Sequence, residues 1–185
     1  MVRVVKVPLA LTGTPGTGKS SVTSLLAPRI RSTEVATLAI RCGAARWTEG
    51  GLEVDLSRLR SALRRPSAWG EVDLVVGHLA HLLPVRDVLV LRCHPEELVR
   101  RLRLARRGNA RDRRENYAAE ALDVILWEAI RPRRRVWEVD TTGRSLAEVA
   151  REVERRLRRK GRSSYGRIDW LADPRVTAHL LDRGP

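Results

Sequence analysis

The segment from Gly13 to Ser20 combines residue types and spacing that could bind the phosphates of a nucleotide. It reads GTPGTGKS and fits the pattern G-x-x-x-x-G-K-[ST] of a phosphate-binding loop, or P-loop. Glycines in such a loop let backbone amide groups point inward, and with the start of a following helix these groups attract an anion. An apolar run precedes the loop and an amphipathic run follows it. This context predicts a strand, a P-loop and a helix in succession.

The side chains of the loop have separate expected roles. Lys19 carries a positive charge that can meet the β- and γ-phosphates of ATP, which makes it a candidate catalytic residue. The hydroxyl of Ser20 is a natural ligand for Mg²⁺, and Ser21 extends the start of the helix toward the α-phosphate. The residues that we expect to bind the nucleotide are Gly13, Gly16, Thr17, Gly18, Lys19, Ser20 and Ser21. The loop thus predicts ATP and Mg²⁺ as cofactors.

Length and composition restrict the class of protein. With 185 residues and 43% hydrophobic content, the chain can form one domain with a full core. No apolar run approaches the ~20 residues that a membrane span needs. The chain also runs almost at once into the strand before the P-loop, which leaves no room for a cleavable signal. We therefore expect a cytoplasmic protein that does not bind a membrane.

Positive charge dominates the chain. It has 36 Lys and Arg residues against 22 Asp and Glu, which gives a formal net charge of +14. The electrostatic field of such a positive net charge attracts polyanions, including RNA, as well as nucleotides. A genome biased toward Arg codons is the alternative explanation, although it accounts for arginine in place of lysine and not for the excess of bases.

Strand-like and helix-like runs alternate along the chain, which predicts an α/β fold with a parallel β-sheet flanked by helices. Strand-like runs cover residues 5–11, 72–76, 88–91 and 136–139. Helix-like runs cover residues 19–26, 55–64, 95–107, 115–130 and 145–159. The stretch 34–41 fits either a strand or the start of a helix. Residues 43–54, with three glycines and Trp47, are expected to form a loop-rich insertion.

Two of the expected helices carry start signals. Ser145 and Glu148 have the spacing of a capping box, in which each side chain binds the other residue's backbone amide. Pro95 is followed by two acidic residues, which suit the first turn of a helix. The segment 109–114 is basic and is expected to lead into the 115–130 helix rather than to belong to it.

Further motifs lie at intervals beyond the P-loop. They are TGTPGTGK at 12–19, HLAHLLP at 78–84, Arg107-Gly108, Asn116 with Glu120, and Glu128-Ala129. Together they resemble the adenylate kinase isoenzyme 6 family, in particular its archaeal members, over about residues 8–159. Gly166–Trp170 in the tail also resembles the archaeal members. The resemblance implies a P-loop NTPase fold like that of nucleoside monophosphate (NMP) kinases.

The same resemblance implies a domain organisation and an activity. Residues 1–160 would form the kinase-like domain, with a small NMP-binding insertion at about 34–58 and a lid at about 106–116, and residues 161–185 would form a tail. The implied enzyme converts ATP and AMP into two ADP with broad acceptor specificity, hydrolyses ATP and takes part in maturation of the small ribosomal subunit. Its implied partners are AMP or another NMP, a small-subunit ribosomal protein and rRNA.

Other functions stay open at this point. The same family also allows an ATPase assembly factor with little true kinase role. A kinase for a non-nucleotide acceptor, such as shikimate or gluconate, would need acceptor residues that the sequence does not display. An RNA-binding protein without catalysis would leave the P-loop unexplained.

Three arginines outside the P-loop are candidates for contacts with phosphate. An NMP kinase needs positive charge around two phosphate chains, because phosphoryl transfer depends mainly on positioning and charge neutralisation. Arg106 and Arg107, at the end of the 95–107 helix, can supply a lid, and Arg41 in the insertion is positioned to meet the acceptor. The resemblance implies that Arg107 contacts the nucleotide. We expect Arg41 and Arg106 to bind substrate, with solvated side chains as the alternative.

His78 is the most specific candidate for a catalytic residue outside the P-loop. It follows an apolar strand, at the sheet edge where open α/β folds bind ligands. The resemblance implies a catalytic role in ATP hydrolysis, and a structural histidine is the alternative. Family members often carry an acid two positions earlier, but this chain has Val76. Asp73 lies five strand residues from His78, about 17 Å away, so the sequence does not identify an acid that helps to hold magnesium.

Overall fold

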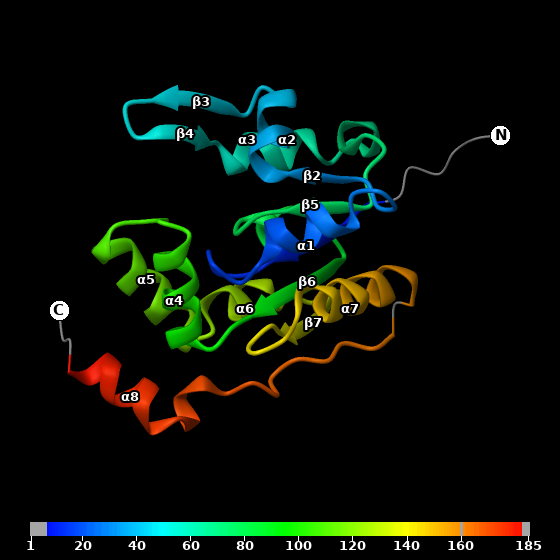
Figure 1. The fold of residues 1–185 in the computed structure, drawn as a ribbon. Helices are drawn as coiled ribbons and strands as arrows, with labels where there is room; N and C mark the ends of the chain where they lie inside the picture. Colours follow the sequence, from blue (N-terminus) through cyan, green and yellow to red (C-terminus); the bar gives the residue numbers. More distant parts are fainter. Residues whose placement is uncertain (1–6, 160, 183–185) are drawn as a thin grey trace.

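A parallel sheet of five strands forms the centre of the chain (Figure 1). The computed structural model describes residues 7–159 and 161–182. The strands lie in the order β2-β5-β1-β6-β7. They are β1 (Leu9–Thr12), β2 (Ser32–Glu34), β5 (Leu74–Val76), β6 (Asp87–Arg92) and β7 (Arg135–Asp140). The sheet confirms the predicted fold class, and the predicted strand 5–11 begins outside the described residues.

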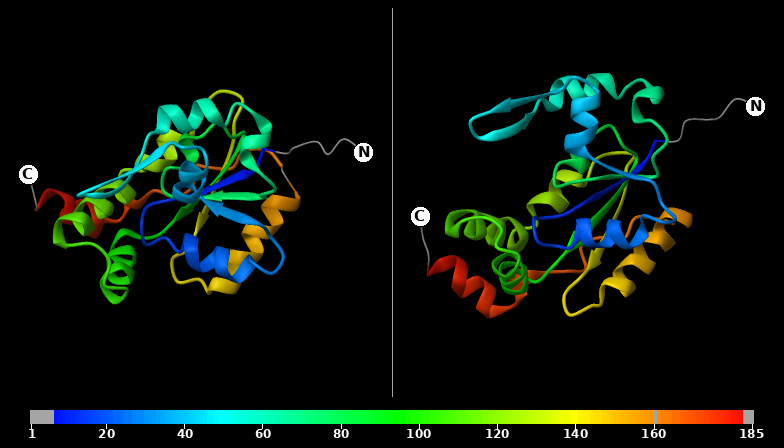
Figure 2. Two further views of the ribbon diagram at one scale, coloured as in Figure 1. Left: turned by 90° about the horizontal axis from the view of Figure 1, so that it is seen from above. Right: turned by 45° about the horizontal axis from the view of Figure 1, so that its top comes forward.

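Helices cover both faces of this sheet (Figure 2). They are α1 (Lys19–Leu26), α2 (Val35–Arg41), α3 (Leu56–Ala62), α4 (Pro95–Leu104), α5 (Ala110–Ala121), α6 (Val124–Ala129), α7 (Leu146–Arg158) and α8 (Pro174–Leu181). Short 3₁₀ helices lie at Pro66–Trp69, Ala80–Leu82 and Trp170–Ala172. Among the residues described, none of these helices has both the length and the apolar character needed to cross a bilayer.

Alternating side chains of the strands pack into two hydrophobic layers, one on each face, as expected for a sheet that is covered on both faces. Leu9 and Leu11 of β1 belong to a buried cluster with residues of α1 and α7. Ala10, between them, belongs to the opposite cluster with residues of α2, α3 and α6. The middle strand is therefore fixed on both sides, and its carboxyl end leads directly into the P-loop.

The predicted loop-rich insertion is instead a β-hairpin. Strands β3 (Ala45–Thr48) and β4 (Gly51–Val54) pair in antiparallel register, with Thr48 opposite Gly51. The glycines that suggested a loop serve the turn, since Gly51 has a φ of +112° that other residues rarely adopt. The ambiguous stretch 34–41 contains both expected structures, because β2 ends at Glu34 and α2 starts at the next residue.

The prediction of one helix over 115–130, preceded by a basic leader, is wrong at both points. Helix α5 starts at Ala110, because Asn109 and Asp112 form a capping box in which each side chain accepts from the other residue's amide. Exposed arginines do not prevent a helix there. The chain then breaks at Asp123, whose φ is +57° and whose carboxylate pairs with Arg92 of β6. Helix α6 begins after this turn.

The tail lies along the outer side of β7 and then turns to the helices α4 and α5 (Figure 1). Ser164 pairs with Trp137 of β7, and its amide donates to the carbonyl of Val136. Farther on, Val176 of α8 is buried against Tyr117 and Ala121 of α5. The tail therefore joins the sheet to helix α5.

Candidate functional site

The P-loop folds tightly at the carboxyl end of β1. Gly13 has a φ of +141°, and a Cβ there would lie 2.3 Å from the carbonyl oxygen of Leu91. Gly18 precedes α1 with a φ of +97°. Side chains at these positions would force the loop away from β6 or strain its backbone. The glycine spacing that marked the motif is thus required by the path of the chain.

Lys19 lies over the loop with its ammonium held by backbone. Its Nζ donates to the carbonyl oxygen of Gly13 at 2.6 Å and to that of Thr14 at 3.0 Å. Burial lowers the pKa of Lys19 to about 8, Glu120 opposes the shift with its negative charge, and Arg107 adds to it. A phosphate anion at this position would favour the charged form of the lysine.

A cavity of about 870 Å³ opens around the loop, a size that suits a ligand site. Its walls come from the P-loop and α1, from the ends of β2 and β5, from β4, from α4, and from the turn between β7 and α7. Lining residues outside the P-loop include Glu34, Val35, Leu52, Val54, Val76, His78, Arg101, Ala105, Arg107, Thr141, Arg144 and Leu146. The carboxyl edge of the sheet therefore carries the site, as in other open α/β folds.

Most of the residues predicted for the site line this cavity. They are Gly16, Thr17, Gly18, Lys19, Ser20, Ser21, His78 and Arg107. Gly13 contributes the carbonyl that holds Lys19. The side chain of Arg107 makes no hydrogen bond or ion pair with other residues that the structure describes, so it can turn toward an anion in the cavity.

Two predicted substrate residues do not line the cavity. Arg41 ends α2, and its Nη2 donates to the carbonyl oxygens of Ala68 and Trp69 at 3.0 and 3.1 Å, so the guanidinium stabilises the 3₁₀ helix there. Arg106 is exposed beyond α4, with a φ of +51°. The roles of both residues in binding substrate stay predictions.

The two histidines after β5 have different surroundings. His78 lines the cavity, and burial together with the charge of Lys19 lowers its pKa, so the ring is neutral at pH 7. His81 is buried, with Nδ1 3.0 Å from the hydroxyl of Thr12 and Nε2 2.9 Å from a carboxylate oxygen of Glu128. These bonds give His81 a structural role between β1 and α6.

A buried acidic centre, formed by Glu120 and its hydrogen-bond partners, lies behind the P-loop. The residue types in the sequence did not by themselves predict it. Glu120 is 2% exposed and accepts a hydrogen bond of 2.5 Å from the hydroxyl of Thr14. It also accepts from Arg92 Nε at 2.8 Å, from the amide of Cys93 at 3.1 Å and from Trp170 Nε1 at 3.2 Å. This centre connects the P-loop to β6, α5 and the tail.

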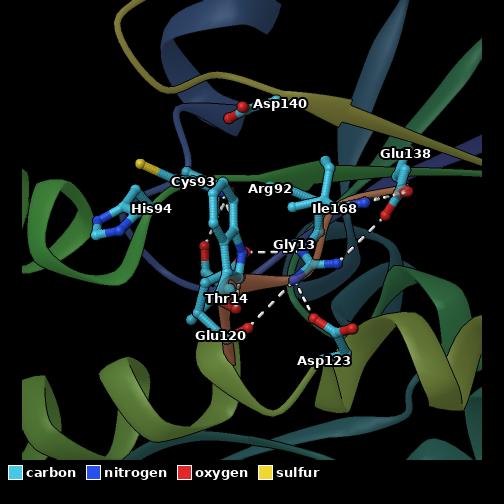
Figure 3. Close-up of polar contacts among 12 residues, drawn as sticks. Gly13, Thr14, Arg92, Cys93, His94, Glu120, Asp123, Glu138, Asp140 and Ile168 are labelled. Carbon is cyan, nitrogen blue, oxygen red and sulfur yellow. Dashed lines mark hydrogen bonds and ion pairs between the residues drawn. The ribbon is translucent and has the colours of Figure 1, made fainter. Parts of the chain in front are cut away.

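Arg92 carries the positive charge of this centre, between Glu120, Asp123 and Glu138 (Figure 3). The available signal was the position of Glu120, three residues after Tyr117 and one before Ala121, on the apolar side of α5. An acid on a buried helix face needs a partner. The sequence did not show that this partner lies on β6.

Comparisons with known proteins identify a family and several relatives. Residues 9–123 match the family described as AAA domain. A protein of Archaeoglobus fulgidus named "Putative adenylate kinase" is 42% identical over 173 residues, which cover 89% of this chain and 92% of that one. A protein of the same name from Thermococcus onnurineus is 36% identical over 176 residues, 94% of this chain and 97% of its own.

Solved structures of shikimate kinases have a similar fold. The enzyme of Bacteroides thetaiotaomicron aligns with a TM-score of 0.52 at 16% identity, over 83% of this chain and 99% of that one. The Acinetobacter baumannii enzyme, in complex with shikimate, gives a TM-score of 0.53 at 16% identity, over 80% and 91%. At this identity the likeness shows the fold alone. Since the archaeal relatives align over nearly their whole length at 36–42% identity, the chain belongs to the family of archaeal proteins named "Putative adenylate kinase".

Proposed function

We propose that the chain is a nucleoside monophosphate kinase that transfers the γ-phosphoryl group of ATP to AMP. The observation that carries the proposal is one continuous cavity around Lys19, which extends from the P-loop to the hairpin wall on one side and to α4 and α7 on the other. In this reaction an oxygen of the AMP phosphate forms a bond to the γ-phosphorus, and the bond to the leaving ADP breaks. The archaeal relatives' shared name supports this reaction.

The two walls suit different nucleotides. We propose that the base of ATP lies against α4 and the start of α7, where Ala105 and Leu146 are apolar and Arg101 is held by Thr141. The acceptor would then lie toward Leu52 and Val54 of the hairpin. On this proposal residues 1–160 form the catalytic domain, about 34–58 bind the acceptor, and about 106–116 close as a lid.

Charged groups at the P-loop would stabilise the transferring group. Lys19 and the loop amides would hold the β- and γ-phosphates, Arg107 would add charge from the lid, and neutral His78 would face the γ-phosphate. Arg41 and Arg106 remain proposed acceptor contacts that would require movement of their elements. Narrower assignment to the isoenzyme 6 family is part of the same proposal.

Magnesium fits the donor set at the loop. The hydroxyl of Ser20 lines the cavity at the start of α1, and Mg²⁺ usually combines few protein ligands with phosphate oxygens and water. Consistent with this, the described residues contain no group of three or more acid, histidine or cysteine side chains that could hold a metal alone. When bound, Mg²⁺ supplies positive charge to the β- and γ-phosphates.

The test is to incubate the purified protein with Mg-ATP, with and without AMP, and to follow ADP and inorganic phosphate separately. Formation of ADP that requires AMP and releases no phosphate is the expected result. Phosphate release that is independent of AMP would contradict the kinase proposal. Shikimate and gluconate serve as control acceptors, and turnover of either in place of AMP would also contradict it.

A second candidate is an ATPase that assists maturation of the small ribosomal subunit. The observation that favours it is the net charge of +14 together with exposed arginines around the α4–α5 connection, namely Arg103, Arg106, Arg107 and Arg114. Helix α7 supports RNA binding less, since Arg155, Arg156 and Arg158 pair with acids one turn earlier. Phosphate release stimulated by rRNA or by a ribosomal protein would support this candidate.

A further inference from the structure

The carboxyl end of β5 lacks the acid that would help to hold magnesium. Val76 occupies that position and lines the cavity with a hydrocarbon side chain. Asp73, at the other end of the strand, accepts from the amide of Arg31 and does not line the cavity. A carboxylate for a metal near the P-loop must therefore come from another element.

The neighbouring strand carries an acid at the same level. In the parallel register of β2 and β5, Glu34 lies beside Val76, which puts their Cα atoms roughly 4.8 Å apart. Partners in such a register project to the same face of the sheet. Val76 packs in the cluster that contains Val22 of α1, so Glu34 projects toward the face that carries α1 and Ser20.

The carboxylate of Glu34 is available for a ligand. It is exposed and makes no hydrogen bond or ion pair with the residues that the structure describes. In that part of the chain it is also the one carboxylate among the side chains lining the cavity. By contrast, the acids Glu120 and Glu138 are bonded to Arg92.

We propose that Glu34 supplies the carboxylate that binds Mg²⁺ in the Mg-ATP complex, directly or through one bound water, together with the hydroxyl of Ser20. The proposal rests on the proposed function, because it assumes that Mg-ATP binds at the P-loop. Carboxylate and hydroxyl oxygens are hard ligands that suit this ion, and Mg²⁺ retains several waters that can bridge to a side chain. Glu34 would thus supply the carboxylate from β2, the strand next to β5, at the same level of the sheet as Val76.

The experiment measures metal affinity directly and needs no turnover. Mn²⁺ is titrated into the protein saturated with a non-hydrolysable β,γ-imido analogue of ATP, and bound Mn²⁺ is followed by electron paramagnetic resonance. For Glu34→Gln we expect Mn²⁺ affinity of the complex to fall about tenfold or more. Affinity for the analogue without metal should be unchanged or higher, since a negative charge has been removed.

Two further variants make the test specific. Adding Val76→Asp to Glu34→Gln returns a carboxylate to the same level of the sheet and should restore Mn²⁺ affinity. Glu49→Gln, in the exposed hairpin turn outside the cavity lining, is the matched control and should have no effect. Unchanged Mn²⁺ affinity in Glu34→Gln would overturn the proposal. A higher KM for AMP with unchanged Mn²⁺ affinity would overturn it as well, and would assign Glu34 to the acceptor.

Failure of this proposal can be distinguished from failure of the proposed function. Binding of Mn²⁺ and the analogue depends only on the nucleotide site, whereas formation of ADP from AMP by the unaltered protein tests the kinase reaction. A protein that loses Mn²⁺ affinity on Glu34→Gln but does not phosphorylate AMP would support the metal site and contradict the kinase.

Discussion

At the scale of single residues, Lys19 places a positive charge in the P-loop against two backbone carbonyls. Its ammonium donates to two loop carbonyls, and partial burial lowers its pKa to about 8, so the charged form is only modestly favoured at neutral pH. Binding of phosphate requires that charge. On the proposed function, the lysine would therefore connect nucleotide affinity to pH in a way that an exposed lysine, with a pKa near 10.4, would not.

The first prediction concerns this pH dependence. As pH rises through about 8, Lys19 of the free protein loses its proton, so affinity for the ATP analogue should weaken by up to about tenfold per pH unit above that value. Affinity measured by calorimetry between pH 7 and 10 checks it. Lys19→Arg keeps its charge throughout, so any affinity that it retains should not vary with pH over this range. A constant affinity of the unaltered protein would contradict the prediction.

Removing the charge gives a second prediction. Lys19→Ala should reduce ATP turnover about 100-fold or more, because a preorganised positive group at the transferring phosphate is lost. Steady-state turnover is the measurement, and circular dichroism checks that the variant is folded. Retained turnover in a folded variant would refute the assignment of the P-loop.

His78 gives a third prediction. Because its ring is neutral at pH 7 and lines the cavity, it can accept a proton or orient a water. For the ATPase candidate, His78→Ala should therefore depress ATP hydrolysis about 100-fold while changing analogue affinity much less. Comparing the two losses in one preparation is the check. Equal losses in hydrolysis and binding would mean that His78 has a structural role.

At the scale of elements, the hairpin forms one wall of the site. Leu52 and Val54 of β4 line the cavity on the side proposed for the acceptor. Replacing both with alanine removes apolar contact area there, so the KM for AMP should rise about tenfold or more. Affinity for ATP should stay the same. Kinetics with each nucleotide varied in turn measures the difference, and a rise in the KM for ATP alone would place the hairpin in the donor site instead.

Short-range sequence signals predicted the elements that depend only on residues close together in the chain. The P-loop and α1 follow from motif spacing, and the capping box of Ser145 and Glu148 is present at the start of α7. The hairpin was not predicted, because glycines favour a loop when the pairing of the two strands is unknown. The start of α5 was missed because Asn109 and Asp112 form a less common capping box, beside arginines that suggested a solvated leader.

Contacts between distant residues could not be predicted in this way. The break at Asp123 depends on Arg92, and the position of Glu34 beside Val76 depends on which strands become neighbours. The location of Arg41 away from the cavity lining likewise depends on the carbonyls of residues 68 and 69. Such features come from the topology of the sheet, which sequence periodicity does not specify.

At the scale of the whole molecule, the acidic centre at Glu120 makes the tail part of the support of the P-loop. Trp170 of the tail and Thr14 of the loop both donate to this one carboxylate. The amides of Arg167 and Ile168 donate to Glu138, which also pairs with Arg92. Loss of the tail would therefore leave buried acceptors short of donors.

The last prediction tests this connection. Trp170→Phe keeps most of the aromatic surface but removes the N–H donor to Glu120, so it should destabilise the protein by about 1–3 kcal/mol. Thermal denaturation and analogue affinity are the measurements. Tyr165→Phe, at an exposed tail position, is the control. Removal of residues 161–185 should have a larger effect, and a truncated protein with unchanged stability and affinity would contradict the role given to the tail.

Because the chain is synthesised from its N-terminal end, the late position of Trp170 in the sequence has a further consequence. A chain emerging from the ribosome folds from its N-terminal end, and the P-loop at residues 13–20 is synthesised well before Trp170. The donors to Glu120, however, come from residues 14, 92, 93 and 170. A nascent chain therefore carries the nucleotide motif long before its support is complete, and we expect tight binding to begin only once the tail has been translated.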